Sequence, residues 1–459
     1  MKFLTFAAVA SAFAIPDASV ISQLVLADNK AAAGKAVKAV HAVETAKDTV
    51  KDWIREGLSP SVPSAFDTDK ELNAVDLDAL STDLPIFDPI VVGGKSKTSN
   101  LTLYQLIASS ANTTQFVSLI NEFPELVTLL NTTTLDDPAA VNHTLFVPVD
   151  TAFAALPGWN ETTTAVRESI VRYHIGVGDL PYKVLFATHT VPSLYDEPLL
   201  GGEAQRLRVR FEKKLGVRVN FAARIVAPNF IAANGVLHAI DSVVVPPTFV
   251  GRQLSLVPDH YSSLLLAMQS SNFTQYIHGL TLNGSTVLAP SNAAFTLLGP
   301  ELNAFLFNTP RGLKYLQALL KYSTVPNATV YSDAFYGPTT LVPPAAANPG
   351  FVQRLHYQLP TLLGPTVSVN VTSVPGYTVM LVNSKVRVAV QDGVAKNGVI
   401  QEVDHVVFPP LPATVPGSPW VDPPVKTVAD LVARLGPYVE DDGDDEVAAA
   451  PAAAPVNEL

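Results

Sequence analysis

The chain contains no cysteine among its 459 residues, and only three tryptophans and three methionines. The lack of cysteine excludes disulfide bonds and thiolate metal sites. Charged residues are also scarce, at 15% of the chain against about 25% in an average protein. The polar surface is therefore expected to consist mostly of threonine, serine, asparagine and glutamine. The formal net charge of −11 argues against a nucleic-acid partner, because a phosphate backbone repels an acidic protein.

The N-terminus carries a short hydrophobic run. Lys2 is followed by an apolar stretch from Phe3 to Ala14, which ends in the small-residue motif Ala12-Phe13-Ala14. This pattern is typical of a secretory signal peptide over residues 1–14, and it predicts a mature chain that begins near Ile15. The alternative is a buried N-terminal helix. The stretch is too short to span a bilayer, so no transmembrane segment is predicted.

The tripeptide Asn-x-Ser/Thr, the acceptor for N-linked sugars, is frequent in this chain and supports secretion independently. Attached sugars would also explain a surface with few charges. These sequons lie between residues 100 and 372, and their asparagines are Asn100, Asn112, Asn131, Asn142, Asn160, Asn272, Asn283, Asn327 and Asn370.

Two stretches of the chain share one pattern. Thr144–Pro157 and Thr286–Leu298 are each interpreted as a short apolar strand, a proline and a helix with an inward-facing phenylalanine. Pro148 is expected to end the first strand, because proline cannot donate a hydrogen bond to a sheet. Asp150 and its counterpart Asn292 stand where a helix N-cap belongs, and both are good capping residues. The chain therefore contains an internal repeat.

A second pair of stretches closes each repeat. Asn234-Gly235 and Asn397-Gly398 are strong signals for a tight hairpin, and each precedes a strand that ends in two prolines. Val217–Phe221 and Val367–Val371 alternate as strands, and we interpret them as equivalent strands of the two repeats. Both repeats are therefore predicted to be α+β units of one topology.

This arrangement resembles the fasciclin domain family. The family's first signature box is similar to the two strand–proline–helix stretches, and its second box is similar to the two closing hairpins. Its tyrosine–histidine motif is similar to Tyr173-His174, whereas the second repeat has Ser323 in place of the histidine. The resemblance covers residues 100–247 and 258–410. It implies two tandem α+β domains, each a wedge of two short β-sheets with helices packed along one edge, in a secreted or surface-anchored adhesion protein without catalytic activity.

Other segments flank or interrupt the repeats. Residues 15–99 are expected to form an N-terminal helical segment and an acidic linker. Residues 333–365 are rich in proline and are expected to form a loop. Residues 411–459 are expected to be a proline-rich, acidic and largely disordered tail, with a short helix from Thr427 to Leu435.

Tyr173 and His174 are the candidate binding residues. They follow an amphipathic helix, so a rigid scaffold would present them, and nearby glycines leave the backbone accessible. The first domain is therefore expected to carry more of the binding function. The alternative is that His174 is a buried hydrogen-bond partner that fixes the end of the helix.

No metal and no cofactor are predicted. Asp241 and Asp404 recur at one register of the closing strand and are expected to be structural acceptors rather than catalytic acids. No G-x-S-x-G motif is present, which disfavours a hydrolase of that type. The histidines of the first repeat that could act as metal ligands lack a spacing such as H-E-x-x-H; they are His143, His174, His189 and His238.

Two classes of function are compatible with the sequence. The first, which we expect, is a secreted, glycosylated, non-enzymatic adhesion or matrix protein at the cell surface or cell wall that binds cell-surface or matrix proteins or glycans. The second is an enzyme or small-ligand-binding protein with a pocket between the domains. A reaction common to both repeats is disfavoured, because His174 and His238 are replaced by Ser323 and Gln401. The sequence indicates neither the oligomeric state nor whether the two domains touch.

Overall fold

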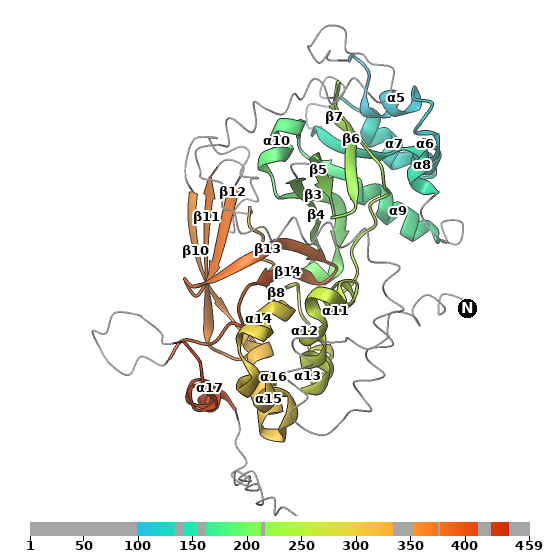
Figure 1. Ribbon diagram of the computed structural model, residues 1–459. Coiled ribbons are helices and arrows are strands. Elements are labelled where there is room, and N and C mark those ends of the chain that lie inside the picture. Colours follow the sequence, from blue (N-terminus) through green and yellow to red (C-terminus); the bar gives the residue numbers. More distant parts are fainter. Residues whose placement is uncertain are drawn as a thin grey trace, which may run out of the picture.

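Two domains follow each other along the chain in the computed structural model of this protein (Figure 1). Domain 1 extends from helix α5 to strand β7, and domain 2 extends from helix α11 to strand β14 and includes helix α17. Both contain helices and strands, which confirms the predicted α+β class. The predicted signal peptide lies outside the described residues, which are 99–133, 141–154, 162–212, 216–333, 353–374, 377–411 and 424–439.

Domain 1 wraps its strands into a closed ring and packs short helices along one side of it (Figure 1). The strands are hydrogen-bonded in the order β1-β2-β3-β4-β5-β6-β7, and β7 pairs with β1 in parallel. The elements are α5 (Leu103–Ala108), α6 (Thr114–Ile120), α7 (Pro124–Asn131), β1 (His143–Pro148), α8 (Asp150–Phe153), α9 (Thr164–Tyr173), β2 (Ile175–Val177), α10 (Tyr182–Ala187), β3 (Thr190–Glu197), the 3₁₀ turn η4 (Pro198–Leu200), β4 (Glu203–Glu212), β5 (Gly216–Val219), β6 (Ala223–Ala232) and β7 (Gly235–Ile240).

Domain 2 has one sheet in the order β10-β11-β12-β13-β14-β8-β9, with its helices gathered at one end (Figure 1). The elements are α11 (Val250–Ser255), α12 (Pro258–Ser270), α13 (Phe273–His278), β8 (Ser285–Pro290), α14 (Asn292–Leu297), α15 (Pro300–Asn308), α16 (Pro310–Tyr322), β9 (Thr324–Pro326), β10 (Gln353–Pro360), β11 (Thr366–Val374), β12 (Tyr377–Val382), β13 (Val386–Ala395), β14 (Gly398–Val403), α17 (Val428–Leu435) and the 3₁₀ turn η6 (Gly436–Tyr438).

The strand order is the same in the two domains. Beginning at β3, domain 1 has the order β3-β4-β5-β6-β7-β1-β2, which corresponds strand by strand to the order that begins at β10 in domain 2. Domain 1 adds one pairing, between Gly176 of β2 and Ser193 of β3, and this pairing closes its ring. The prediction of one topology for both repeats is therefore confirmed.

The role predicted for Asp150 was wrong. Helix α8 begins at Asp150 itself, and its N-cap is Val149. The Asp150 carboxylate instead accepts hydrogen bonds at the start of another helix, α6, from the Gln115 N–H (2.9 Å) and the Thr114 hydroxyl (2.8 Å). A carboxylate is stabilised there by the free N–H groups of the first turn. The repeated acidic or amide residue thus joins two helices rather than starting one.

Asn292 confirms this correction in domain 2. The N-cap of α14 is Ser291, whose side chain accepts from the Ala294 N–H. The Asn292 side chain instead accepts from the Ser263 N–H of α12 (2.8 Å) and donates to the Asp259 carbonyl (2.9 Å). The signature box therefore holds the preceding helices in both domains.

The predicted equivalence of Val217–Phe221 and Val367–Val371 was also wrong, by one strand. The first stretch lies mainly in β5, and the second lies in β11. The common strand order makes β11 equivalent to β4, and β12 equivalent to β5. Both stretches contain the pattern V-x-V-N, and this shared pattern led to the wrong pairing. Alternation of apolar and polar residues predicts only a strand with one buried face, and neighbouring strands of one sheet have that property in common.

The predicted proline-rich loop 333–365 contains a strand, β10, that sequence analysis missed. It pairs with β11 over its whole length. Leu355, Tyr357 and Leu359 alternate along it and pack against the core of domain 2. This period of two was a usable signal, but the prolines on either side favoured a loop.

The short helix predicted near Thr427 is α17. Thr427 is its N-cap, and Leu431 and Leu435 are buried in the core of domain 2. This part of the predicted tail therefore packs on the domain, whereas residues 412–423 and 440–459 lie outside the described part of the chain.

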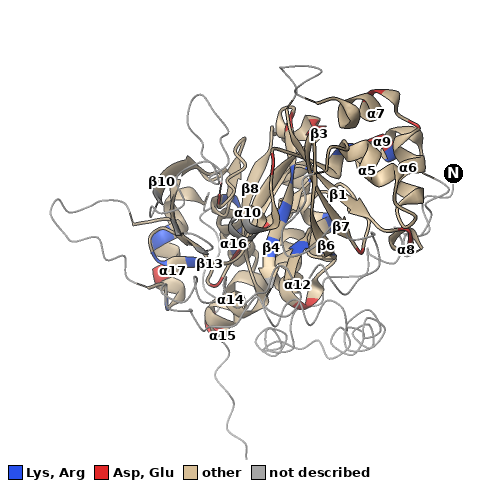
Figure 2. Cartoon of the chain, turned by 90° about the horizontal axis from the view of Figure 1, so that it is seen from above, with Lys and Arg blue, Asp and Glu red and all other residues tan. Residues whose placement is uncertain are grey.

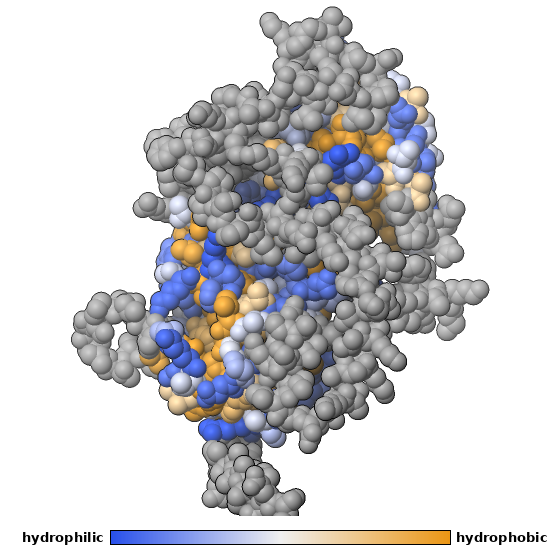
Figure 3. All heavy atoms as spheres, in the orientation of Figure 1, coloured by the Kyte–Doolittle hydropathy of each residue, from blue (hydrophilic) through white to orange (hydrophobic). Residues whose placement is uncertain are grey.

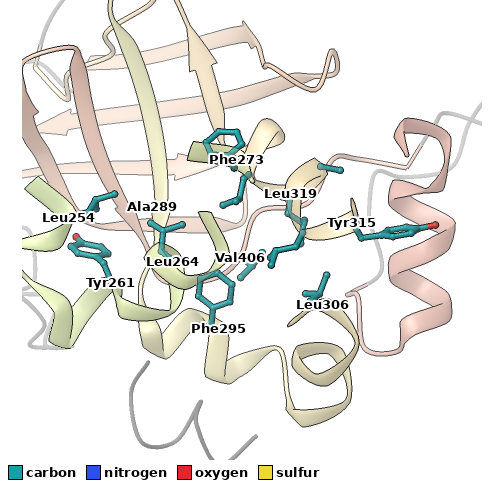
Figure 4. Close-up of a cluster of buried hydrophobic side chains, with 14 of the residues drawn as sticks. Leu254, Tyr261, Leu264, Phe273, Ala289, Phe295, Leu306, Tyr315, Leu319 and Val406 are labelled. Carbon is teal, nitrogen blue, oxygen red and sulfur yellow. The ribbon is translucent and has the colours of Figure 1, made fainter. Parts of the chain in front are cut away.

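Each domain has one core cluster where helices cover the sheet and a second cluster formed mainly by strand residues. Figure 4 shows part of the core of domain 2, where Leu264, Phe273 and Phe295 from three helices gather beside Ala289 of β8. On the face seen in Figure 3, hydrophobic and hydrophilic residues interleave over the coloured part of the lower half, as expected for strands with one exposed face. Within the described ranges, no helix has both the length and the apolar character needed to span a bilayer.

Candidate functional site

Tyr173, the first predicted binding residue, ends helix α9, and its side chain is fully buried in domain 1. Its hydroxyl donates to the Arg206 carbonyl on β4 (2.8 Å) and accepts from Asn220 Nδ2 (2.6 Å). Burial raises the pKa of Tyr173, so the phenol is neutral at physiological pH. The side chain thus ties the end of the helix to the sheet.

His174, the second predicted residue, is the C-cap of the same helix and is also fully buried. Nδ1 bonds the Ile170 carbonyl (2.7 Å), and Nε2 accepts from the Val244 N–H (3.0 Å). A carbonyl only accepts and an N–H only donates, so the ring is neutral and carries its proton on Nδ1. Burial lowers the pKa of His174 to about 4, while the bond to Ile170 opposes this shift.

The equivalent residues of domain 2 keep the tyrosine and lose the ring. The Tyr322 hydroxyl donates to the Thr366 carbonyl (3.2 Å) and accepts from Asn383 Nδ2 (2.9 Å). Ser323 keeps the backbone contact of His174: its carbonyl accepts from the Leu288 N–H (2.8 Å), as the His174 carbonyl accepts from the Phe146 N–H (3.0 Å). The tyrosine anchor is therefore common to both domains, and the histidine link belongs to domain 1.

The structure thus brings Tyr173 and His174 together inside the domain, each with 0% of its surface exposed. Every polar atom of the two side chains has a partner within domain 1. A binding role for these residues stays a prediction. Their geometry favours the alternative, in which they stabilise the helix end on which neighbouring segments rest.

His238 on β7 has an equally structural position. Its Nε2 bonds the Leu180 carbonyl (2.9 Å), and its Nδ1 accepts from the Asn229 N–H (3.3 Å). Asn229 has a positive φ of 64° in a bulge between β6 and β7. Burial lowers the pKa of His238 to about 4, with the Leu180 bond opposing, so this ring is also neutral.

Gln401 makes the equivalent two hydrogen bonds in domain 2. Its Nε2 donates to the Val330 carbonyl (2.8 Å), and its Oε1 accepts from the Asp392 N–H (3.0 Å). Asp392 occupies the matching bulge with a φ of 62°. An amide therefore replaces an imidazole, and the same two backbone groups remain paired.

The remaining predicted sites have structural positions. Asp241 and Asp404 each accept a backbone N–H from the neighbouring strand, from Arg224 (2.8 Å) and Arg387 (3.1 Å), which confirms their predicted role as acceptors. Among the described residues, no group of three or more histidines and carboxylates is arranged to hold a metal ion. His143 is buried in β1, and His189 lies at the contact between the domains.

The asparagines of most predicted glycosylation sites are exposed. Asn142 and Asn370 are half-buried, and Asn160 lies outside the described residues. Asn272 and Asn327 have positive φ angles of 56° and 55°, a conformation that asparagine adopts more readily than most residues. The exposed asparagines are Asn100, Asn112, Asn131, Asn272, Asn283 and Asn327. Their occupancy stays a prediction.

The two domains touch through a buried polar junction, which the sequence did not predict. Asp333 of domain 2 accepts three hydrogen bonds from domain 1, two from the Thr190 N–H and hydroxyl (both 2.6 Å) and one from the His189 N–H (2.9 Å). Arg206 donates to the same Thr190 hydroxyl (2.9 Å), and its guanidinium lies 5.0 Å from the ring centroid of Tyr331. A domain 2 carboxylate thus holds the start of β3.

A second set of contacts continues the junction from His189. Its Nδ1 donates to the Ser332 hydroxyl (2.8 Å), which in turn donates to the Asp392 carboxylate. The Ser332 N–H also donates to Asp392 (2.8 Å). Burial lowers the pKa of His189, while the nearby carboxylates of Asp333 and Asp392 oppose this shift.

Strand β4 provides further bonds across the junction. Arg208 Nε donates to the Gln391 carbonyl (2.9 Å), and Gln205 Nε2 donates to the Ala395 carbonyl (3.2 Å) on β13. Figure 2 shows blue Lys and Arg residues grouped around β4, β6 and β7. Sequence analysis missed this region, although the alternating Arg206-x-Arg208-x-Arg210 was a visible signal in an acidic chain.

Comparison with known proteins reports two matches to one family model. The model described as "Fasciclin domain" matches residues 111–246 and 259–409. The solved structure of a FAS1 domain pair from the insect cell adhesion molecule fasciclin I is 19% identical, covers 64% of this chain and 96% of its own, and has a TM-score of 0.31.

Curated relatives cover different shares of the chain. The aurofusarin biosynthesis cluster protein S of Gibberella zeae is 26% identical over 371 residues, which are 75% of this chain and 88% of that protein. The transforming growth factor-beta-induced protein ig-h3 of Sus scrofa is 24% identical over 64% of this chain and 38% of that protein. Protein sll1483 of a Synechocystis strain is 31% identical over 31% of this chain and 78% of that protein.

Proposed function

The chain belongs to the fasciclin domain family, and from this premise we propose that it is a secreted, glycosylated, non-enzymatic adhesion protein. It binds cell-surface or matrix proteins or glycans through the outer surface of its two domains. The observation that carries the proposal is the pair of fasciclin domains, matched over residues 111–246 and 259–409. The transforming growth factor-beta-induced protein ig-h3 is among its relatives, and this chain spans 38% of that protein.

The distribution of sequons supports export and glycosylation. Six of the nine acceptor asparagines are exposed in the described residues, and they lie on both domains. Bulky sugars at these positions cover a surface that has few charges. Recognition would then use loops and sugars on a rigid scaffold, which is how binding residues are commonly presented.

Export and glycosylation are tested by mass spectrometry of the protein from its native host. We expect a mature N-terminus near Ile15 and sugar-modified peptides that contain Asn142 and Asn283. An intact Met1 terminus together with unmodified Asn142 and Asn283 would contradict this part of the proposal.

Adhesion is tested by immobilising the secreted protein and exposing it to cell-surface or cell-wall extracts. We expect retention above that of a secreted glycoprotein without fasciclin domains. Enzymatic removal of N-linked sugars separates two modes: loss of retention indicates binding through glycans, and unchanged retention indicates binding through the protein surface. Retention no higher than that of the control glycoprotein contradicts adhesion.

A second candidate function rests on the fungal relative. Because the aligned region spans 88% of the aurofusarin biosynthesis cluster protein S, that similarity extends over nearly a whole protein. A role in small-molecule biosynthesis, as an enzyme or a ligand carrier, is the function that this relationship favours. The test is to incubate the purified protein with a metabolite extract and to identify retained compounds by mass spectrometry. Selective retention or conversion of one compound supports this candidate.

A further inference from the structure

The buried junction divides its charges between the two domains. Domain 1 contributes basic residues on β4, at the alternating positions Arg206, Arg208 and Arg210, which therefore share one face of the strand. Domain 2 contributes acidic residues from three separate segments. The charged side chains that are almost fully buried here are Arg206 (9% exposed), Arg208 (4%), Asp333 (7%), Asp392 (1%) and Glu402 (2%).

Glu402 completes the acidic side. It accepts from the Tyr261 hydroxyl (2.6 Å), and His260 Nδ1 lies 3.4 Å from the same oxygen. Burial raises the pKa of Tyr261, the Glu402 carboxylate raises it further, and Arg208 of domain 1 opposes this shift. Glu402 is the strand partner of Val390 on β13, and the carbonyl of the next residue, Gln391, accepts from Arg208 Nε of the other domain.

Equivalent hydrogen bonds align the basic residues with their counterparts in domain 2. The buried tyrosine hydroxyl donates to the Arg206 carbonyl in domain 1 and to the Thr366 carbonyl in domain 2. Two residues later, the N–H groups of Arg208 and Ser368 each donate to an asparagine side chain. Arg206, Arg208 and Arg210 therefore correspond to Thr366, Ser368 and Asn370.

The acidic residues are aligned by the same method. The Thr144 hydroxyl accepts from the Leu180 N–H, and the Thr286 hydroxyl accepts from the Val330 N–H, so residue 180 corresponds to residue 330. Residue 183 then corresponds to residue 333. The bulge residues Asn229 and Asp392 occupy equivalent positions, and the side chains that bond their N–H groups, His238 and Gln401, align the two closing strands. Asp333, Asp392 and Glu402 therefore correspond to Lys183, Asn229 and Ala239.

We propose that the two domains form one rigid unit, joined by a charge-complementary junction that only this pair of domains can make. The basic side occurs in domain 1 alone, and the acidic side occurs in domain 2 alone. The described side-chain hydrogen bonds of Asp333 and Arg208 cross the junction, and Arg206 lies over Tyr331 of the other domain. Separating the domains would therefore remove these partners from charged groups that are almost fully buried. The two halves of the internal repeat have thus diverged into the two sides of one interface.

The geometry has a consequence for assembly. Different faces of the two domains meet, so the contact is heterologous, and a heterologous contact can add further copies in a chain. The free face of domain 2 offers Thr366, Ser368 and Asn370 in place of arginines, and Asn370 is also a predicted glycosylation site. The free face of domain 1 has Asn229 in place of Asp392, and the sequence has Lys183 at the position that corresponds to Asp333. The free faces therefore lack the charged residues that would repeat the contact with another copy of the chain. The protein is expected to be a monomer.

The proposal does not depend on adhesion or on ligand binding, and it is tested on the full-length chain. Because the chain has no cysteine, Ser118→Cys on α6 and Gln275→Cys on α13 place two spin labels on exposed positions of the two domains. Pulsed electron paramagnetic resonance then measures the distance between the labels. The parent is expected to give one narrow distance distribution.

Asp333→Ala removes the acceptor of three bonds across the junction. The distance distribution is expected to widen about twofold, as for domains free to move on a linker. Asp333→Asn is the milder variant, which keeps the shape and loses the charge, and it decides the test if Asp333→Ala does not fold. Asp404→Asn is the matched control, because Asp404 accepts a backbone N–H within domain 2 and should leave the distribution narrow.

A broad distribution in the parent would overturn the proposal, as would Asp333 variants that both stay as narrow as the parent. The exclusive pairing is tested separately by light scattering over a range of concentrations. A constant monomer mass supports it, whereas a mass that grows with concentration shows that the free faces do pair and overturns it.

Discussion

The two domains keep the same hydrogen bonds and change the side chains that make them. At the position of His238, domain 2 has Gln401, and both side chains join a loop carbonyl to the N–H of a bulge residue. At the position of His174, domain 2 has Ser323, which keeps the backbone contact and omits the ring. The comparison teaches that the fold requires paired backbone groups and tolerates several ways of pairing them.

The difference has a chemical consequence. His174 and His238 titrate, whereas Ser323 and Gln401 do not. Domain 1 therefore contains two buried groups that respond to acid, at positions where domain 2 has none. The histidines that looked like candidates for binding or catalysis distinguish the domains mainly in their response to pH.

The largest expected effect tests what the domains share. Gly235 and Gly398 begin the closing strands, and a Cβ at these positions would lie 1.9 Å from the His143 carbonyl oxygen and 2.2 Å from the Ser285 carbonyl oxygen. Gly235→Ala and Gly398→Ala are each expected to lower the free energy of unfolding by about 3 kcal/mol or more, because the parallel strand pair must move apart. Thermal or denaturant unfolding measures this.

Gly178→Ala is the matched control for these variants. Gly178 also has a positive φ (95°), but a Cβ there meets no atom within 4 Å. The expected cost is about 1 kcal/mol, from backbone conformation alone. If Gly178→Ala destabilised the protein as much as Gly235→Ala, the steric explanation would be wrong.

These glycines also mark what the sequence allowed us to predict. Asn-Gly hairpins, strand–proline–helix boxes and the helical spacing of apolar residues are local signals, and the closing strands, β1, β8 and most helices were found from them. Strands β2, β3, β4, β9 and β12 were missed, and β10 was missed because prolines flank it. The partner of Asp150 was also missed, because a residue 35 positions away in the chain supplies it.

The candidate site was less predictable than the fold. Burial decides whether Tyr173 and His174 face a partner or the core, and the sequence around a helix end does not report it. The junction joins residues more than 140 positions apart, such as Thr190 and Asp333. The alternating arginines of β4 were visible in the sequence, but their acidic partners come from three separate segments of domain 2.

The next largest expected effect is a loss of stability at low pH that differs between the two domains. The pKa of His174 and His238 falls from 6.5 in the unfolded chain to about 4 in the folded protein. The unfolded chain therefore binds these protons first as the pH falls, and stability that is fully present above about pH 6.5 is lost down to about pH 4, by up to about 3 kcal/mol per histidine.

Hydrogen exchange with mass spectrometry at pH 7 and pH 5, corrected for the intrinsic exchange rate, resolves this effect by domain. Protection is expected to fall more in β1 and β7 of domain 1 than in β8 and β14 of domain 2. An equal loss in the two domains would show that the histidines do not set the acid response.

His174→Ala is expected to have the next largest effect. It leaves the Val244 N–H without its acceptor, which costs about 1–3 kcal/mol for a buried donor. Ser323→Ala is the matched variant in domain 2 and is expected to cost about 1 kcal/mol or less. Melting temperature and adhesion are measured on both variants. Lost adhesion with an unchanged melting temperature for His174→Ala would instead support the predicted binding role of His174.

The smallest expected change in stability comes from exchanging histidine and glutamine at the position of His238 and Gln401. His238→Gln is expected to cost about 1 kcal/mol or less, because Gln401 shows that a glutamine reaches the same two backbone groups. His238→Ala, which leaves the Leu180 carbonyl and the Asn229 N–H unpaired, is expected to cost about 1–3 kcal/mol. Gln401→His should cost more than His238→Gln, since Gln401 Nε2 also bonds the Asp392 carboxylate (3.1 Å), a contact that the single N–H of a neutral imidazole cannot add.

Denaturant unfolding ranks the three variants, and His238→Gln should also remove part of the acid response of domain 1. If His238→Gln destabilised the protein as much as His238→Ala, the imidazole and the amide would not be interchangeable, and the domains would differ here in packing rather than in the group that pairs the backbone.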